Sequence, residues 1–335
     1  MSTLSNLLIP AVLFFALGVI ARLIKSDLKF PPDLAKVLSI YLLMAIGLHG
    51  GYELSKADLG TAVNSITWAL ILGFSLPIIG YFALVVTRKV SPLDAAAISA
   101  HYGSVSAGTF LTAIAFLDNS GIEYESYPLI MLAVMESPAI VVGLLLAAMA
   151  RKQLAKSEGR TVVRDEDDNG GGWGHLLHEA FTNGSVVVLI GSMIIGAISK
   201  PSGIESLKPF IDEIFMGVLC LFLFEMGMEA ARRLKEFKKV GVPLALFGVL
   251  MPLVGGAVGT FVGYSILGFS VGGATLVAVL GASASYIAVP PAMRLAVPEA
   301  NPSFYLTLSL GITFPFNVLV GIPLYYWFAQ YLAAV

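Results

Sequence analysis

The sequence has little charge and almost no cysteine. Only 13% of its 335 residues are Asp, Glu, Lys or Arg, whereas roughly a quarter of the residues in an ordinary soluble domain are charged. A folded chain that is 57% hydrophobic and has so few charged residues cannot hide its apolar surface from water. We therefore expect a lipid membrane as its solvent. The net charge of −2 argues against nucleic acid as a partner. Cys220 is the only cysteine, which excludes an internal disulfide.

Long apolar stretches fill most of the chain and predict an all-α membrane protein with ten spans. A helix needs about 20 apolar residues to cross the hydrocarbon layer, and most of the stretches reach that length. No small-residue cleavage site follows the first stretch, so we expect a retained helix and not a signal peptide. The predicted spans are 6–24, 34–51, 62–87, 93–117, 127–150, 183–199, 209–230, 241–267, 271–296 and 303–332.

The distribution of basic residues predicts the orientation of these spans. If the N-terminus lies outside, only Lys56, Lys200 and Lys208 of the 20 Lys and Arg residues fall in outward loops. Because Lys and Arg collect in cytoplasmic loops, we expect a multi-pass protein of the cell's inner (plasma) membrane with both termini outside the cytoplasm.

The two halves of the chain repeat each other. Residues 91–146 align with 270–324 at an offset of about 179, and 43–54 align with 223–234 at a similar offset. Because each half has five predicted helices, the halves must be inverted relative to each other. We expect a first repeat at 1–150, a polar cytoplasmic linker at 151–182 and a second repeat at 183–335. The linker is typical of a flexible tether, and a docking site for a cytoplasmic regulator is the alternative.

Each repeat contains a run of small and hydroxyl residues inside a span, at 102–109 and at 281–291. Pro290 and Pro291 cannot sit in an unbroken helix, and unwound backbone at membrane depth must line a cavity or be buried in protein. A break leaves a helix N-terminus with free N–H groups and a positive dipole end. The runs contain no Lys or Arg, which favours a small, weakly basic anion. The alternative is close helix packing through small residues. The hydroxyl donors are Ser104, Ser106, Thr109, Ser283 and Ser285.

Carboxylates inside spans are costly and usually functional. Glu136, near the middle of the fifth predicted span, is the best candidate to bind a hard cation such as sodium together with hydroxyl and carbonyl oxygens. A structural, hydrogen-bonded Glu136 is the alternative. Asp94 could serve the same cation or could cap a helix that starts after Ser91.

Three other polar residues in the spans have structural interpretations. Glu225 and Glu229 precede Arg232 and Arg233, and we expect them to form ion pairs at the membrane edge. His101 lies just before the first predicted break, and packing is its expected role.

Several runs together resemble the sodium-dependent bicarbonate transporter family known from cyanobacteria. The runs are 47–51, 226–231, 282–290, 298–302 and 310–317. The resemblance extends through nearly all the predicted spans. It implies two inverted five-helix repeats divided into a core and a gate domain, a homotrimer, and uptake of bicarbonate coupled to sodium. Cyanobacterial members are also regulated by a PII-like protein on the cytoplasmic side, so the resemblance implies such a partner.

Carried over residue by residue, the resemblance implies two sets of site residues. The substrate-binding set is Gly103, Ser104, Ser106, Ala107, Gly108, Thr109, Ala282, Ser283, Ala284, Ser285 and Tyr286. The sodium-binding set is Asp94, Ser106, Thr109, Glu136, Ser285 and Asn317.

Three rival functions remain at this point. One keeps the mechanism and replaces bicarbonate with another small anion or a carboxylate. A second is a cation/proton antiporter driven by Glu136 and Asp94. The third, an intramembrane hydrolase, would need paired aspartates or a Ser–His dyad such as Ser104 and His101. The second repeat has no histidine at the matching place, so we expect no enzymatic activity.

Overall fold

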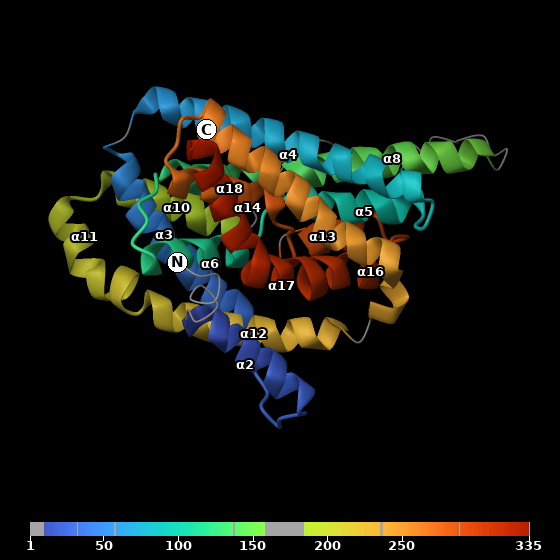
Figure 1. Cartoon of the computed structure of the whole chain (residues 1–335), viewed down its shortest axis with the longest axis horizontal. Helices are drawn as coiled ribbons and strands as arrows, with labels where there is room; N and C mark the ends of the chain where they lie inside the picture. The colour runs from blue at the N-terminus through green and yellow to red at the C-terminus, as the bar shows by residue number, and fades with distance from the viewer. Residues whose placement is uncertain are drawn as a thin grey trace.

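The computed structural model describes residues 10–31, 33–56, 58–136, 138–157, 184–234, 237–287 and 289–334. In this part of the chain all regular secondary structure is helical (Figure 1). Most of the predicted linker 151–182 lies outside the described residues.

Six of the described helical segments are long and apolar enough to cross a membrane. They are Leu34–Leu54, Leu59–Thr87, Tyr127–Leu154, Pro201–Arg233, Gly241–Ile266 and Pro302–Ala334. Shorter apolar helices occur at Pro10–Leu23, Val187–Ile198 and Val271–Ala282. Each predicted span overlaps a helix or a pair of helices.

The first half contains one interrupted span among the described residues. The predicted span 93–117 is divided at 104–106, as expected. In the predicted span 127–150, α7 ends at Met135 and α8 begins at Pro138, but Glu136 keeps helical backbone angles (φ −65°, ψ −37°), and Tyr127–Leu154 forms one helical segment. The helices are α2 (Pro10–Leu23), α3 (Leu34–Leu54), α4 (Leu59–Thr87), α5 (Pro92–Gly103), α6 (Ala107–Asn119), α7 (Tyr127–Met135) and α8 (Pro138–Ser157).

The second half ends with a helical span that contains wide turns. Two stretches of π-helix, η3 and η4, flank a single turn at Phe314–Phe316 in the last span. π-Helical turns inside α-helices are frequent at functional sites. The elements are α10 (Gly184–Ile198), α11 (Pro201–Lys208), η1 (Pro209–Glu213), α12 (Phe215–Leu234), α13 (Phe237–Phe261), η2 (Val262–Ile266), α14 (Val271–Ala282), α15 (Val289–Ala296), α16 (Pro302–Leu306), η3 (Thr307–Thr313), α17 (Phe314–Phe316), η4 (Asn317–Gly321) and α18 (Ile322–Ala334).

Glycines allow α2 and α12 to pack with their backbones in contact. A Cβ atom on Gly18 would overlap the carbonyl oxygen of Phe224, and one on Gly227 would overlap that of Phe15. Small residues at such positions let membrane helices approach closely. This pair lies along the lower edge of the molecule in Figure 1.

Helices α3 and α10 meet in the same way. A Cβ atom on Gly196 would overlap the carbonyl oxygen of Leu48, and one on Gly51 would overlap that of Met193. In both the α2–α12 and the α3–α10 contacts, glycines therefore allow the two helix backbones to touch.

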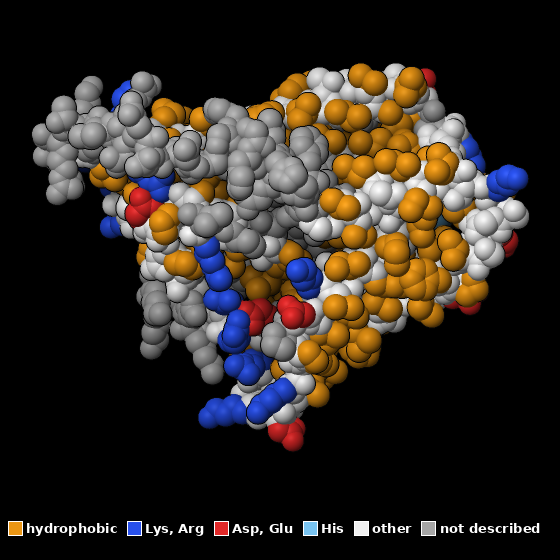
Figure 2. All heavy atoms as spheres, turned by 180° about the vertical axis from the view of Figure 1, so that it is seen from behind, with side chains coloured by type: hydrophobic (Ala, Val, Ile, Leu, Met, Phe, Trp, Pro, Cys, Tyr) orange, Lys and Arg blue, Asp and Glu red, His pale blue; other side chains and the backbone are white. Residues whose placement is uncertain are grey.

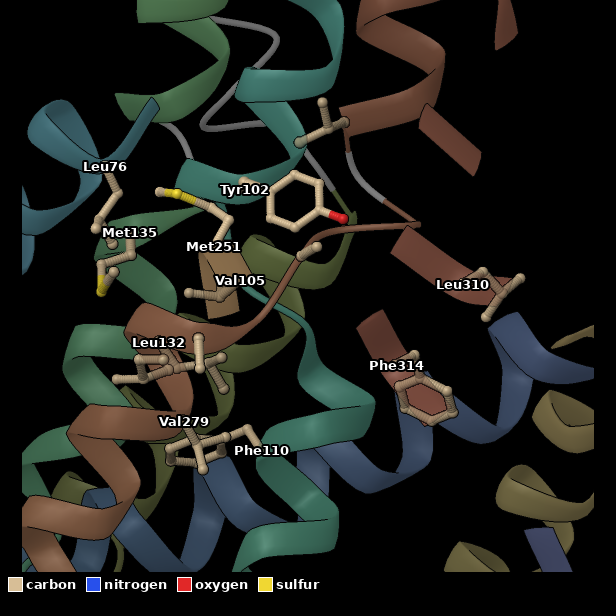
Figure 3. Packing of buried hydrophobic residues seen from close by; sticks show 14 of the residues in the cluster. Leu76, Tyr102, Val105, Phe110, Leu132, Met135, Met251, Val279, Leu310 and Phe314 are labelled. Carbon is tan, nitrogen blue, oxygen red and sulfur yellow. The ribbon is translucent and has the colours of Figure 1, made fainter. Parts of the chain in front are cut away.

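The short helices α5, α6 and α14 form the buried centre. Every residue from Gly272 to Ala282 and from Gly108 to Leu117 is buried. Val105, Phe110, Leu132 and Val279 pack together beside the interruption of the first half (Figure 3). The outer helices instead expose large apolar side chains, which give the broad apolar surface in Figure 2. Exposed examples are Phe74, Phe82, Leu246, Leu250 and Phe261. Such a surface suits lipid.

Candidate functional site

The first interruption is an extended segment between α5 and α6. The helix α5 ends at Gly103, and Ser104 has extended backbone angles (φ −90°, ψ 172°). Ser106 is extended too (φ −112°, ψ 107°) and caps α6 by accepting a hydrogen bond from the Thr109 N–H. Ser, Thr, Asn and Asp favour this cap position because their side-chain oxygens satisfy a free helix N–H. The predicted hydroxyl run therefore sets both the break and the start of α6.

The second interruption covers 283–287 between α14 and α15. Ser283 is extended (φ −83°, ψ 163°). Pro290 and Pro291 lie in the first turn of α15, where proline is tolerated because the N–H it lacks has no partner inside the helix. The break therefore precedes the prolines, as predicted. The prolines also remove two backbone donors, so the N-terminus of α15 offers fewer N–H groups than that of α6.

The two interrupted segments touch each other. The Ser285 N–H donates to the carbonyl oxygen of His101 at 2.8 Å. The Ser106 N–H donates to the hydroxyl oxygen of Ser283 at 3.1 Å. Residues almost 180 positions apart are thus joined at one buried crossing, and we call residues 103–109 and 282–286 the crossing segments.

Hydrogen-bond donors gather at the N-terminus of α6. The Ser106 hydroxyl oxygen accepts from the Thr109 N–H at 3.2 Å and from the Thr109 hydroxyl at 2.9 Å, so the proton of Ser106 is free for another acceptor. The N–H groups of Ala107 and Gly108 lie in the first turn, where no partner exists within the helix. A helix N-terminus of this kind attracts anions.

A buried tyrosine hydroxyl meets this helix end. The Tyr286 hydroxyl oxygen is inaccessible to solvent and makes no hydrogen bond of full geometry among the described residues, although the Ser106 side chain lies close enough to interact with it. A Cβ atom on Gly108 would overlap this oxygen, which places the hydroxyl against the first turn of α6. The ring packs edge-on against Phe314, with centroids 5.3 Å apart. A buried hydroxyl without a full hydrogen bond costs about 1–3 kcal/mol, which makes this hydroxyl a candidate donor to a bound anion.

The predicted sodium ligands are only partly brought together. Ser106 and Thr109 are in contact at the α6 N-terminus, and Ser285 lies in the facing segment. The carbonyl oxygen of Glu136 accepts a hydrogen bond from the Ser104 hydroxyl at 3.3 Å, so Glu136 is beside the crossing. Asn317 donates through Nδ2 to the carbonyl oxygen of Ala282 at 2.9 Å.

Asp94 is not brought to the crossing. Its carboxylate accepts from the Ser91 hydroxyl at 2.7 Å and from the Asn301 N–H at 2.7 Å. It lies in the first turn of α5, nine residues before Gly103, which corresponds to roughly 14 Å along a helix. This position counts against the sodium role, and the cap of α5 is Ser91, whose hydroxyl oxygen accepts from the Asp94 N–H at 3.0 Å.

The remaining polar residues of the spans behave partly as expected. Glu229 pairs with Arg232 at 2.5 Å and with Arg233 at 3.0 Å. Glu225 forms no ion pair within the described segments, and its Oε2 is buried without a hydrogen-bond partner there. The His101 ring is fully buried and stacks on Tyr305 with centroids 4.4 Å apart, in agreement with a packing role.

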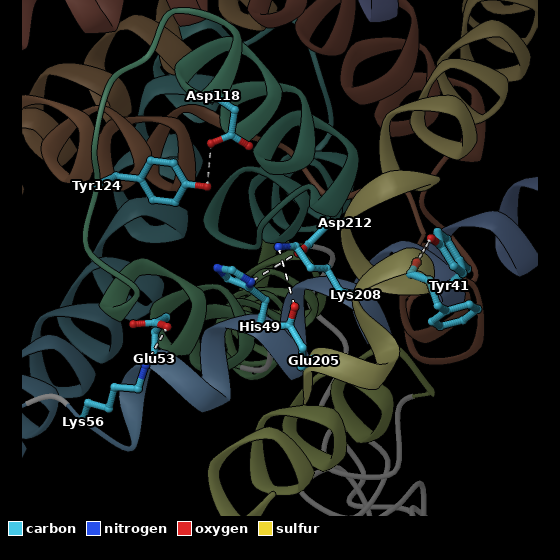
Figure 4. A network of polar contacts seen from close by, with 10 residues as sticks. Tyr41, His49, Glu53, Lys56, Asp118, Tyr124, Glu205, Lys208 and Asp212 are labelled. Carbon is cyan, nitrogen blue, oxygen red and sulfur yellow. Dashed lines mark hydrogen bonds and ion pairs between the residues drawn. The ribbon is translucent and has the colours of Figure 1, made fainter. Parts of the chain in front are cut away.

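A cavity of about 560 Å³ lies apart from the crossing, between α3, α6 and the 121–126 loop. Around it His49 approaches Asp212 at 3.7 Å, and the Tyr124 hydroxyl donates to Asp118 at 3.0 Å (Figure 4). Burial raises the pKa of the Asp118 carboxyl group. None of the predicted site residues lines this cavity, and no group of three His, Cys, Asp or Glu side chains within the described ranges could hold a metal ion.

Two residues at the crossing were missed by sequence reasoning. The Tyr102 hydroxyl and Thr313 Oγ1 are 2.7 Å apart, although the residues are 211 positions apart in the chain. The only signal in the sequence was that Thr313 aligns with Glu136 when Pro138 and Pro315 of the two repeats are matched, which suggested nothing about Tyr102.

Interrupted helices that cross inside a bundle with an apolar outer surface define a multi-pass α-helical membrane transporter. The chain belongs to the Na+-dependent bicarbonate transporter superfamily, because the model of that family matches residues 10–330. A comparison with curated proteins finds no match to the chain.

Proposed function

We propose that this protein imports bicarbonate together with sodium by alternating access. The observation that carries the proposal is the N-terminus of α6, where the unpartnered Tyr286 hydroxyl meets the free donors of Ser106, Ala107 and Gly108. Backbone and hydroxyl donors without Lys or Arg suit reversible binding of a small anion. Membership of the Na+-dependent bicarbonate transporter superfamily supports bicarbonate and sodium as the substrates.

In the proposed cycle, sodium binds first and reduces the repulsion between the anion and nearby carboxylate and carbonyl oxygens. Glu136 is the proposed carboxylate, since it lies beside Ser104. Hydroxyl, carbonyl and carboxylate oxygens suit such a hard cation. The anion then binds at the α6 N-terminus, and a movement of one part of the molecule against the other exposes the crossing to the cytoplasm.

A ten-helix architecture of two inverted repeats is part of the proposal. The close packing of α2 on α12 and of α3 on α10 supports it. Gly47 and Gly227 are 180 positions apart in the chain, and a Cβ atom on either would clash with a partner helix, near Leu189 and Phe15 respectively. The division into a core and a gate domain, the homotrimer, the PII-like partner and the outward position of both termini stay predictions.

The decisive experiment is uptake of labelled bicarbonate by purified protein in liposomes. Uptake should require an inward sodium gradient and should not occur with potassium or choline in place of sodium. An excess of formate, acetate or nitrate should compete weakly. Strong competition by one of these anions would indicate that this anion, and not bicarbonate, is the substrate.

The antiporter alternative makes a different prediction. It requires sodium-driven proton movement without bicarbonate, which a pH-sensitive dye inside the same liposomes would report. The position of Asp94 counts against it, because the Asp94 carboxylate is engaged with Ser91 and Asn301 and lies far along α5 from Glu136.

A further inference from the structure

The last helical span, Pro302–Ala334, contacts the C-terminal ends of both α5 and α14. Two buried polar residues on it, Thr313 and Asn317, make these contacts, and both are 0% exposed. Each lies at a boundary of a π-helical stretch, since η3 ends at Thr313 and η4 begins at Asn317. The wide turns therefore occur where this span meets the two interrupted helices.

The contact with α5 is a chain of hydrogen bonds with a fixed direction. Thr313 Oγ1 lies 2.6 Å from the carbonyl oxygen of Gly248. A carbonyl has no proton, so Thr313 must donate there with its single hydroxyl proton. The Tyr102 hydroxyl, 2.7 Å from Thr313 Oγ1, must then donate to Thr313. The chain runs from Tyr102 on α5 through Thr313 to Gly248 on α13.

The contact with α14 satisfies a free carbonyl at the end of that helix. Ala282 is the last residue of α14, so its carbonyl oxygen has no partner inside the helix. Asn317 donates to it at 2.9 Å, and the Tyr325 hydroxyl donates to Asn317 Oδ1 at 2.9 Å. This bond fixes the end of α14 directly, without a side chain from α14.

The two halves differ at this point. Tyr102 aligns with Gly281, which has no side chain, and Thr313 aligns with Glu136, whose carbonyl oxygen contacts Ser104. The Tyr102–Thr313–Gly248 chain therefore has no counterpart in the other repeat. It is specific to the end of α5, directly before the crossing segment that leads to the α6 N-terminus.

We propose that Thr313, acting through Tyr102, is a positioning residue that sets how α5 presents the 103–109 crossing segment to the anion. Neither residue needs to touch the substrate. The proposal rests on the proposed function for its transport consequences, but the positioning itself can be measured without transport.

The test compares Thr313→Val, Thr313→Ser and Tyr102→Phe. Valine keeps the shape of threonine and removes the hydroxyl, and serine restores the hydroxyl. The matched control is Thr260→Val, because Thr260 is also 0% exposed but donates only to Gly256 on its own helix, at 2.7 Å. Hydrogen–deuterium exchange of peptides covering 101–109 and 281–287 reports the Ser106 and Ser285 amides that join the crossing segments.

Thr313→Val and Tyr102→Phe should speed exchange of these amides roughly fivefold, the effect expected when one net hydrogen bond is lost. They should raise the half-saturating bicarbonate concentration and leave the maximal rate nearly unchanged, whereas Thr313→Ser should match the parent. Equal exchange in Thr313→Val and the parent, or an equal increase in Thr260→Val, would overturn the positioning role. Absence of bicarbonate uptake by the parent protein would count against the proposed function alone.

Discussion

Replacement of Tyr286 by phenylalanine should weaken anion binding without weakening the fold. The hydroxyl is buried, has no partner among the described residues, and lies against the first turn of α6. Its removal leaves the ring packed on Phe314. A hydrogen bond to a charged group is worth about 1.5–3 kcal/mol, and about 1.4 kcal/mol corresponds to a factor of ten. We expect the half-saturating bicarbonate concentration to rise roughly ten- to a hundredfold.

The stability of the protein without substrate should change in the opposite direction. A buried hydroxyl without a partner costs about 1–3 kcal/mol, so Tyr286→Phe should unfold at the same temperature as the parent or at a higher one. Thermal unfolding of the purified protein in detergent measures this. Most substitutions destabilise a protein, so unchanged or increased stability with weaker binding identifies a residue that serves the ligand.

Two other tyrosines provide matched controls. Tyr305 also has a buried hydroxyl without a partner in the described part of the chain, but it stacks on His101, away from the α6 N-terminus. Tyr305→Phe should leave bicarbonate affinity unchanged. The Tyr325 hydroxyl donates to Asn317, so Tyr325→Phe should lower stability by about 1–3 kcal/mol. The reasoning fails if Tyr286→Phe leaves bicarbonate affinity unchanged, or if Tyr305→Phe weakens it equally.

Three further predictions concern the cation, the glycine at the α6 N-terminus and the topology. Glu136→Gln should require much more sodium for half-maximal uptake at similar protein yield, whereas the control Glu205→Gln, at an exposed residue, should not. If Glu136→Gln needs no more sodium than the parent protein, Glu136 is not part of the sodium site. Gly108→Ala should weaken uptake because its Cβ would overlap the Tyr286 oxygen and approach the Phe222 ring to 2.8 Å. Tyr286→Phe added to Gly108→Ala should improve the folded yield relative to Gly108→Ala alone; no improvement would show that the Phe222 contact causes the defect. A cysteine at Gly171 in a Cys220→Ala background should react with an impermeant thiol reagent only after cell lysis, and labelling of intact cells would contradict the cytoplasmic linker.

The interruptions at 104–106 and 283–287 could be predicted because local residues cause them. Ser106 caps α6 with its own side chain, and two successive prolines, Pro290 and Pro291, favour the first turn of a helix. The same local signals led to the hydroxyl residues of the crossing segments, whereas Gly108 and Tyr286 entered the predicted site only through the resemblance to the transporter family.

Features that depend on distant contacts could not be predicted. Asp94 had two interpretations, and neither included the hydrogen bond that its carboxylate accepts from Asn301, more than 200 residues away. The contact between Tyr102 and Thr313 has the same character.

The two repeats interrupt matching helices, but the residues at the two interruptions differ. The anion and the cation are therefore not expected to bind equally to both repeats. The N-terminus of α6 keeps its backbone donors and gains those of Ser106 and Tyr286, whereas α15 begins with two prolines that have no N–H. An anion held by backbone donors is therefore expected nearer to α6 than to α15. Glu136, the carboxylate residue proposed for sodium, belongs to the first repeat as well, and Thr313 stands in its place in the second. The first repeat then supplies most of the binding groups. The second supplies the Tyr286 hydroxyl, the Ser283 and Ser285 contacts and the last helical span that holds the end of α14.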